Sequence, residues 1–152
     1  MRQDSRFSRM LHVLLHMARH EKGFTSEQIA QMLGTQSSVV RRTLAGLREA
    51  GFVRSETGPH GGWKIDGDLS SISLRDIHLA LGTKRLFAIG IDNENPSCAV
   101  EAIVNETVVD ALEIAERQLM DRLGEITLAQ LAREFDARCK ASGWDERHSP
   151  VG

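Results

Sequence analysis

Long apolar stretches are absent from this 152-residue sequence. No run of about 18 apolar residues occurs, so the sequence offers no candidate for a transmembrane helix. The start of the chain also lacks a small-residue cleavage site after its apolar stretch, which argues against a secretory signal. We therefore expect a soluble, cytoplasmic protein without a membrane partner.

Cysteine is scarce as well, because Cys98 and Cys139 are the only two in the chain. Their separation matches neither a zinc finger nor the disulfide framework of a small secreted protein, so we expect free thiols. Patterns that indicate catalysis are also missing. The sequence has no Ser-His-Asp or Cys-His order, no phosphate-binding loop and no paired-carboxylate motif, and we do not expect an enzyme.

Charge is unevenly distributed, although the formal net charge is only −2. Residues 1–66 carry ten Lys and Arg against six Asp and Glu, whereas residues 67–152 carry nine against fifteen. A basic first part offers a place for phosphates, and an acidic second part indicates a different role.

Three helices are predicted in the basic part. The first has the i, i+3, i+4 spacing of an amphipathic helix from Phe7 to Ala18 and ends near His20. Thr25 to Gln28 forms a capping-box pattern that begins the second. A turn at Gly34 leads into the third helix, which Gly51 ends. This succession is the pattern of a helix-turn-helix unit.

Two short strands, residues 52–55 and 63–65, are predicted around a loop rich in glycine and proline. The hairpin would be the wing of a winged helix-turn-helix, so the predicted fold class is mainly α with a small β-wing. Residues 73–81 are predicted to form a fourth short helix, because Ser73 and Asp76 fit a capping box. Residues 82–97 have no pattern and are expected to be a loop.

A long helix is predicted from Ser97 to Leu123, and its apolar residues line one side. It would span on the order of 37 Å, more than a small domain needs for its own core. We therefore predict that this side pairs with a second copy of the chain. The predicted interface residues are Val104, Val108, Ala111, Ala115 and Leu119.

The predicted organisation thus has four parts. Residues 1–66 form the winged helix-turn-helix, and residues 67–96 form a short helix and a loop. Residues 97–140 hold the dimerisation helix and a terminal helix over residues 127–139. Residues 141–152 are expected to be a flexible tail.

The third helix and the wing carry the residues that we expect to bind double-stranded operator DNA. A turn of 100° per residue places small polar groups and arginine opposite the apolar face of the helix, where they suit phosphates and base edges. The predicted wing tip is nearly free of side chains and lies between two cations, which suits a minor groove or a backbone. The predicted DNA-binding residues are Thr35, Gln36, Ser37, Ser38, Arg41, Arg42, Arg54, His60, Gly61, Gly62 and Lys64.

Simpler interpretations stay open. The arginines can belong to a solvated helix face, and the wing can be an ordinary hairpin. A winged-helix module that binds proteins instead of DNA is therefore the alternative from another class, although the basic helix and wing favour DNA.

Several segments resemble one family. These are SRFSRMLHVLLHMA near the start, VVRRTLAGLREAG in the third helix, GGW in the wing, ISLRDIHLAL, and NPSCAV around Cys98. Over roughly residues 2–132 the chain is similar to the Rrf2 family of bacterial regulators, which includes iron-sulfur, nitric-oxide and cysteine-metabolism regulators. The resemblance implies a homodimer, joined through the long helix, that acts on a partly palindromic operator; a repressor is the leading hypothesis.

Cluster-binding members of that family supply three cysteines around the start of the long helix, where this sequence has only Cys98. We therefore expect no iron-sulfur cluster and no other cofactor. A less common arrangement in the family combines one cysteine with ligands from the first two helices. In such an arrangement His12 would match one of the ligands, but Ser8 and Leu33 stand at positions where the other ligands would be expected. A metal- or cluster-dependent regulator that uses His12 and Cys98 stays an alternative, and His12 with His16 is a weaker metal candidate.

Cys98 lies at the predicted N-terminus of the long helix. Unpaired backbone N–H groups and the helix dipole favour a thiolate there, which predicts a lowered pKa and sensitivity to oxidation or alkylation. The opposing interpretation is an inert cysteine that packs the helix start. Cys139, on the terminal helix, is expected to be incidental.

Overall fold

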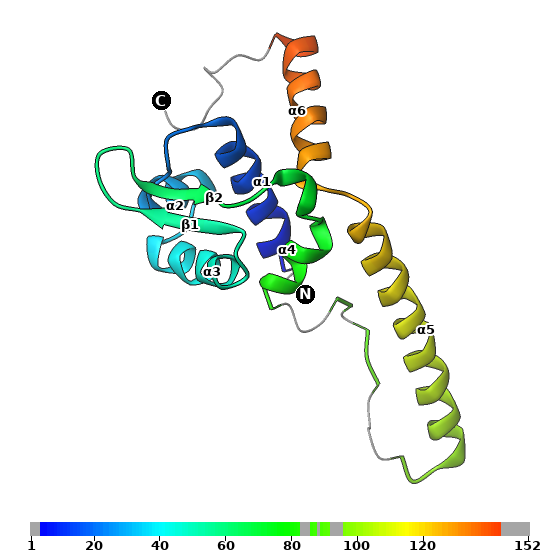
Figure 1. The fold of residues 1–152 in the computed structure, drawn as a ribbon. Coiled ribbons are helices and arrows are strands. Elements are labelled where there is room, and N and C mark those ends of the chain that lie inside the picture. The colour runs from blue at the N-terminus through cyan, green and yellow to red at the C-terminus, as the bar shows by residue number, and fades with distance from the viewer. Residues whose placement is uncertain (1–3, 83–85, 88, 92–95, 144–152) are drawn as a thin grey trace.

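The computed structural model describes residues 4–82, 86–87, 89–91 and 96–143 (Figure 1). Its helices are α1 (Arg6–Arg19), α2 (Ser26–Leu33), α3 (Ser37–Glu49), α4 (Leu74–Ala80), α5 (Ala99–Gly124) and α6 (Leu128–Ser142), with a 3-10 turn, η1 (Leu69–Ser71). The strands β1 (Val53–Glu56) and β2 (Gly62–Ile65) form one antiparallel sheet. The predicted fold class, mainly α with a small β-wing, is confirmed.

The first three helices and the wing share one hydrophobic core with α4 and the start of α6. Each helix contributes the apolar face that its spacing predicts, and Val13, Ile29 and Leu44 are completely buried. Trp63 of β2 closes the core from the wing side, where its indole N–H donates a hydrogen bond to the Ser26 hydroxyl at 2.9 Å. A buried indole needs such a partner, so this bond ties the wing to α2.

Reciprocal capping boxes begin three of the helices. Thr25 with Gln28 starts α2 and Ser73 with Asp76 starts α4, as the sequence predicts. Residues 127 and 130 form the same box at α6. Each box satisfies backbone N–H groups that have no partner inside the helix.

The wing is also joined to the loop between α1 and α2. Phe24 and Trp63 exchange two backbone hydrogen bonds, of 3.1 and 2.8 Å, so that Phe24 pairs with β2 outside the two-stranded sheet. Gly23 lies so close to the wing that a Cβ would stand 2.5 Å from the carbonyl oxygen of Gly61. Backbone contact this close fixes the wing against the helices.

The strands and α5 begin or end within two residues of their predicted bounds, and two other segments differ further. Helix α6 continues three residues past the predicted end at Cys139, because Lys140, Ala141 and Ser142 are compatible with a helix and Gly143 ends it with φ of 64°. The turn η1 was not predicted, since its three residues are too few to show a helical period. Parts of the predicted loop, residues 83–85, 88 and 92–95, and the predicted tail from residue 144 lie outside the described residues.

Helix α5 extends away from the rest of the molecule (Figure 1). It has 26 residues, and none of them is buried. Only its C-terminal end meets the winged unit, where Leu123 packs against the core and Gly124 lies against the Arg75 guanidinium group. None of the helices in the described ranges combines the length and apolar character that crossing a bilayer requires.

Candidate nucleic-acid interface

Helix α3 follows α2 through a turn that depends on Gly34. This residue has φ of 61°, and the next amide, that of Thr35, donates to the carbonyl of Ala30 at 2.9 Å. Because a positive φ strains a residue with a side chain, glycine sets this turn. The buried residues of α3 are Val40, Leu44 and Leu47. The opposite side of α3 therefore faces outward.

The outward side of α3 carries several of the predicted DNA-binding residues. Ser38 and Arg42 are exposed and Gln36 is exposed at the N-cap, whereas Thr35 and Ser37 are half-buried. Arg42 makes no ion pair or hydrogen bond within the described part of the chain. Its guanidinium group is available to a phosphate or to the edge of a guanine.

Arg41 lies on the flank of α3 and is already engaged. Its guanidinium group stands 3.3 Å from a carboxylate oxygen of Glu27 on α2. Both side chains are more than half exposed, so this ion pair is weak and a phosphate can displace it.

The two cations beside the wing meet one carboxylate. Lys64 Nζ stands 2.7 Å from one oxygen of Glu56, and Arg54 Nε stands 2.9 Å from the other. Hydrogen bonds from Lys64, and then from Arg54, hold the pKa of Glu56 below its usual value, so the carboxylate stays ionised. Glu56 thus offsets part of the positive charge that the wing would offer to DNA.

The strand register separates these cations from α3. Arg54 pairs directly with Lys64, and Ser55 pairs with Trp63, so alternation puts the cations and the indole on opposite faces of the hairpin. The indole face lies toward α3, since the Arg48 guanidinium group stands 5.7 Å from the Trp63 ring centroid. Arg54 and Lys64 are therefore on the face turned away from the outward residues of α3.

The predicted tip residues of the wing differ in their surroundings. His60 is exposed, whereas Gly61 and Gly62 are half-buried. A Cβ on Gly61 would stand 2.4 Å from the carbonyl oxygen of Glu56, and one on Gly62 would stand 2.6 Å from that of Phe24. The two glycines thus serve the close packing of the hairpin, and the exposed tip consists of the residues before them.

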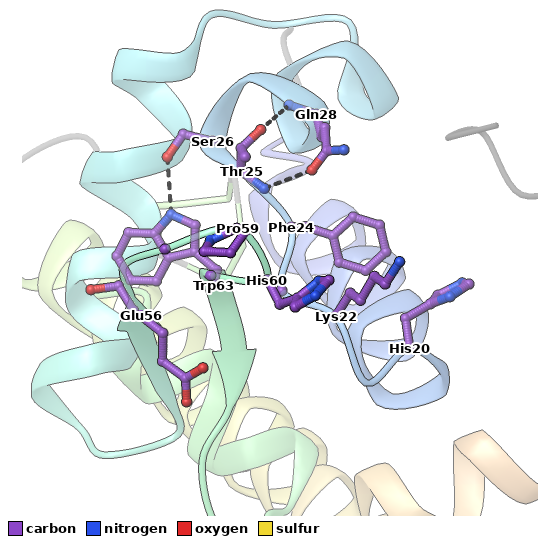
Figure 2. Close-up of a pocket in the computed structure, with 15 residues that line it drawn as sticks. His20, Lys22, Phe24, Thr25, Ser26, Gln28, Glu56, Pro59, His60 and Trp63 are labelled. Carbon is purple, nitrogen blue, oxygen red and sulfur yellow. Dashed lines mark hydrogen bonds between the residues drawn. The ribbon is translucent and has the colours of Figure 1, made fainter.

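A hollow of about 590 Å³ lies between the wing and the loop that joins α1 to α2 (Figure 2). His20 and Lys22 line it from the loop, and Pro59 and His60 line it from the wing. His20 and Lys22 are not among the DNA-binding residues that the sequence predicts. The only feature of the sequence that could have indicated them is that they precede Gly23 by a few residues. Gly23 contacts the wing at Gly61, which is far away in the sequence, so this proximity cannot be seen in a local pattern.

Cys98 is exposed at the N-cap of α5. The nearby backbone N–H groups of Glu101 and then Val100 lower the pKa of the Cys98 thiol below its usual value. Cys139 is also a free thiol, but it is buried beside Arg19. Helix α5 approaches the winged unit only at its C-terminal end, so Cys98 lies at the end remote from α3 (Figure 1).

His12 and His16 meet on one side of α1. Their Nε2 atoms stand 3.0 Å apart. Burial, and then the proximity of His12, lowers the pKa of His16, which favours its neutral form. Within the ranges that the structure describes, however, no three or more His, Cys, Asp or Glu side chains gather closely enough to hold a metal ion.

Helix α5 exposes a broad apolar surface. Among the predicted interface residues, Val104, Ala111 and Leu119 are exposed, and Val108 and Ala115 are half-buried. Other large apolar side chains also reach the surface: Val100, Ile103, Val109 and Ile114. At 100° per residue, Ile114 lies beside Ile103 at the edge of the predicted apolar side, whereas Val109 falls outside it, so the apolar surface is wider than predicted.

Comparison with known proteins identifies relatives over most of the chain. Residues 3–134 match the family described as Rrf2, iron-dependent transcriptional regulator. YwnA of Bacillus subtilis (strain 168), classed among HTH-type transcriptional regulators, is 29% identical over 126 residues, which are 82% of this chain and 92% of YwnA.

Solved structures share the fold. A transcriptional regulator from Lactobacillus plantarum aligns with a TM-score of 0.70 at 23% identity, over 89% of this chain and 92% of that one. The oxidised form of CymR from Staphylococcus aureus aligns with a TM-score of 0.61 at 23% identity, over 87% and 96%. At these identities the likeness concerns the winged-helix fold alone.

Proposed function

This chain belongs to the Rrf2 family of transcriptional regulators, and from that membership we propose that it is a homodimeric repressor that binds double-stranded operator DNA. The observation that carries the proposal is the outward side of α3. Ser38 is exposed there beside Arg42, which has no partner in the described part of the chain. Hydroxyl and guanidinium groups on an exposed helix suit the major groove, which is wide enough to admit one.

The charge distribution supports the same proposal. The formal excess of four positive charges lies in residues 1–66, which include α3 and the wing. DNA binding gains most of its non-specific affinity from such cations, because they release counterions from the phosphates. The loop residue Lys22 and the wing residue His60, at the hollow of Figure 2, extend the proposed contact to the backbone beside the groove.

We propose that α5 forms the dimer with α5 of a second copy. Val104 is 54% exposed and Ile103 is 63% exposed, and a long helix with a wide apolar surface is expected to be covered. A two-fold dimer would present two copies of α3, and we expect two half-sites whose centres are separated by about one helical turn of DNA, 34–36 Å, or a multiple of it.

The family description names iron, and the residues described here do not fit an iron site within one chain. Cys98 is exposed at the free end of α5, and Cys139 is a buried residue of α6. Neither cysteine belongs to a group of three or more potential ligands in the described ranges. We propose that the regulator acts without an iron-sulfur cluster, and we expect anaerobically purified protein to be colourless.

We further propose that Cys98 senses thiol-reactive compounds. Its exposure and the two backbone N–H groups that lower its pKa favour the reactive thiolate. Because Cys98 lies at the end of α5 remote from α3 of its own chain, a signal would pass through the pairing of the two α5 helices, which sets the distance between the two copies of α3.

The proposed function is tested by isolating the genomic DNA fragments that the full chain binds in its source cells. We expect a small set of fragments that share a partly palindromic sequence, and their neighbouring genes should increase in expression when the regulator is deleted. Recovery of proteins with no enriched DNA would instead identify a protein-binding module. A decrease in expression on deletion would identify an activator.

A further inference from the structure

We propose that Val39 reads the 5-methyl group of a thymine in each half-site; this inference rests on the DNA-binding function proposed above. Val39 is 41% exposed. Among the described residues of 1–66, it is the large apolar side chain that the fold leaves exposed. Elsewhere in the described ranges, the exposed large apolar residues are Leu79 and Ile89, together with Val100, Ile103, Val104, Val109, Ile114 and Leu119 of α5.

The position of Val39 places it beside the polar residues of the proposed interface. At 100° per residue, Val39 stands roughly 60° around α3 from Arg42. Along the helix axis the two are separated by about 4.5 Å. Successive bases of one strand are separated by about 3.4 Å. If Arg42 binds a guanine, Val39 therefore lies within about one or two base pairs of it.

The surroundings of Val39 suit an apolar contact. The hydroxyl of Thr43, one turn further along the same flank, donates to the Val39 carbonyl at 2.9 Å, so this polar group is already satisfied inside the helix. Valine is stiff at χ1 in a helix and presents its two methyl groups with little loss of conformational freedom. The side chain is thus held ready for a partner.

Thymine is the base that offers such a partner. In the major groove, guanine, adenine and cytosine present hydrogen-bonding groups, whereas thymine also presents a methyl group at C5. Burial of one methyl-sized group contributes about 0.8 kcal/mol, which is about fourfold in affinity. A valine on this side of α3 therefore favours thymine over cytosine at one position of each half-site.

The test starts with the full wild-type chain and a library of random duplex DNA, from which the preferred sequence is selected. Each thymine of that duplex is then replaced singly by deoxyuridine, which lacks only the methyl group. We expect one position in each half-site at which the replacement weakens binding by about fourfold. With Val39→Ala the same replacement should have no effect, because its methyl-binding partner is absent.

Leu79→Ala provides the matched control, since it removes an exposed apolar side chain of α4 outside the proposed interface. This variant should keep the full response to deoxyuridine. The inference is overturned if the selected duplex responds nowhere to deoxyuridine, or if Val39→Ala responds as the wild type does. Failure to select any sequence would refute the proposed DNA-binding function itself, which separates the two failures.

Discussion

At the scale of single residues, the neighbours Arg41 and Arg42 have different surroundings. Arg41 pairs with Glu27 across the turn between α2 and α3, at 3.3 Å. Arg42 has no such partner in the described part of the chain. A cation that must leave an ion pair before it binds DNA contributes less net affinity, so Arg42 is expected to contribute more than Arg41.

Arg42→Ala should therefore weaken operator binding. If Arg42 binds a base, we expect the binding free energy to weaken by about 1–3 kcal/mol and the sequence preference to relax. If it binds a phosphate, we expect the slope of the logarithm of the binding constant against the logarithm of salt concentration to fall in magnitude by about one. Fluorescence anisotropy over a range of salt concentrations measures both. Arg133→Ala, which removes the same charge from the exposed side of α6, is the control. Unchanged binding by Arg42→Ala at every salt concentration would contradict the role given to α3.

Glu56 neutralises part of the positive charge of Arg54 and Lys64 beside the wing. Glu56→Gln removes the carboxylate that meets Lys64 at 2.7 Å and Arg54 at 2.9 Å. We expect tighter DNA binding and a steeper dependence on salt, because Lys64 is released and can neutralise an additional phosphate, while Arg54 keeps its ion pair with Asp66 at 3.4 Å. Glu134→Gln on α6 makes the same change of charge at a distance and should bind as the wild type does. An unaltered salt dependence for Glu56→Gln would mean that Arg54 and Lys64 serve only the hairpin.

At the scale of elements, the wing depends on its contact with the loop between α1 and α2. Gly23→Ala places a Cβ 2.5 Å from the carbonyl oxygen of Gly61, so the loop and the wing must separate. We expect the free energy of unfolding to fall by about 1–3 kcal/mol, as for other overpacked sites. DNA affinity should also fall, because the wing moves relative to α3.

Denaturation in urea measures the loss of stability. Gly90→Ala is the matched control, because a Cβ there would meet nothing within 4 Å and its φ is not in the positive range. We expect that control to change the stability by no more than about 0.5 kcal/mol. If the Gly23 and Gly90 variants have equal free energies of unfolding, the wing moves to accept the added Cβ without loss of stability, which would contradict this prediction.

The start of α5 gives a second prediction for an element. The N–H groups of Glu101 and Val100 lower the pKa of Cys98, so its thiolate is present at lower pH than that of an ordinary cysteine. Alkylation by iodoacetamide should therefore have its pH midpoint below the usual range for a thiol. Buried Cys139 should react slowly in the folded protein and provides the internal comparison. Mass spectrometry of the two peptides measures both rates.

Measurements of operator affinity test whether modification of Cys98 affects DNA binding. Alkylation should change the affinity of the wild type and of Cys139→Ser, but not that of Cys98→Ser. An equal response of wild type and Cys98→Ser would refute the proposed thiol sensor. A visible absorption band in anaerobically purified wild type, lost in Cys98→Ser, would instead support a cluster.

At the scale of the whole molecule, the proposed dimer depends on α5. We expect Val108→Glu combined with Ala115→Glu to dissociate the dimer, because two unpaired charges would enter an apolar interface. Arg117→Glu changes the net charge by the same −2 but lies on the opposite, charged side of α5, and it should stay dimeric. Light scattering at micromolar concentration measures the mass of each variant. A monomeric wild type would contradict the dimer.

The sequence by itself determined the elements of the winged unit. The boxes of Thr25 with Gln28 and Ser73 with Asp76 join residues three positions apart, so both partners are visible in a short stretch of sequence. The buried face of α3 follows equally from the 3.6-residue period. Local hydrogen bonds and helical periodicity act over a few residues, and these features could therefore be predicted without the tertiary structure.

Only the tertiary structure decided which charged and apolar groups are available to a partner. Glu56 holds Lys64 because the strand register brings them together across the hairpin, and Gly23 brings Lys22 to the wing. The exposure of Val39 likewise depends on how α3 lies in the fold. Each of these results depends on contacts between segments distant in the sequence, and no local pattern of residues specifies such contacts.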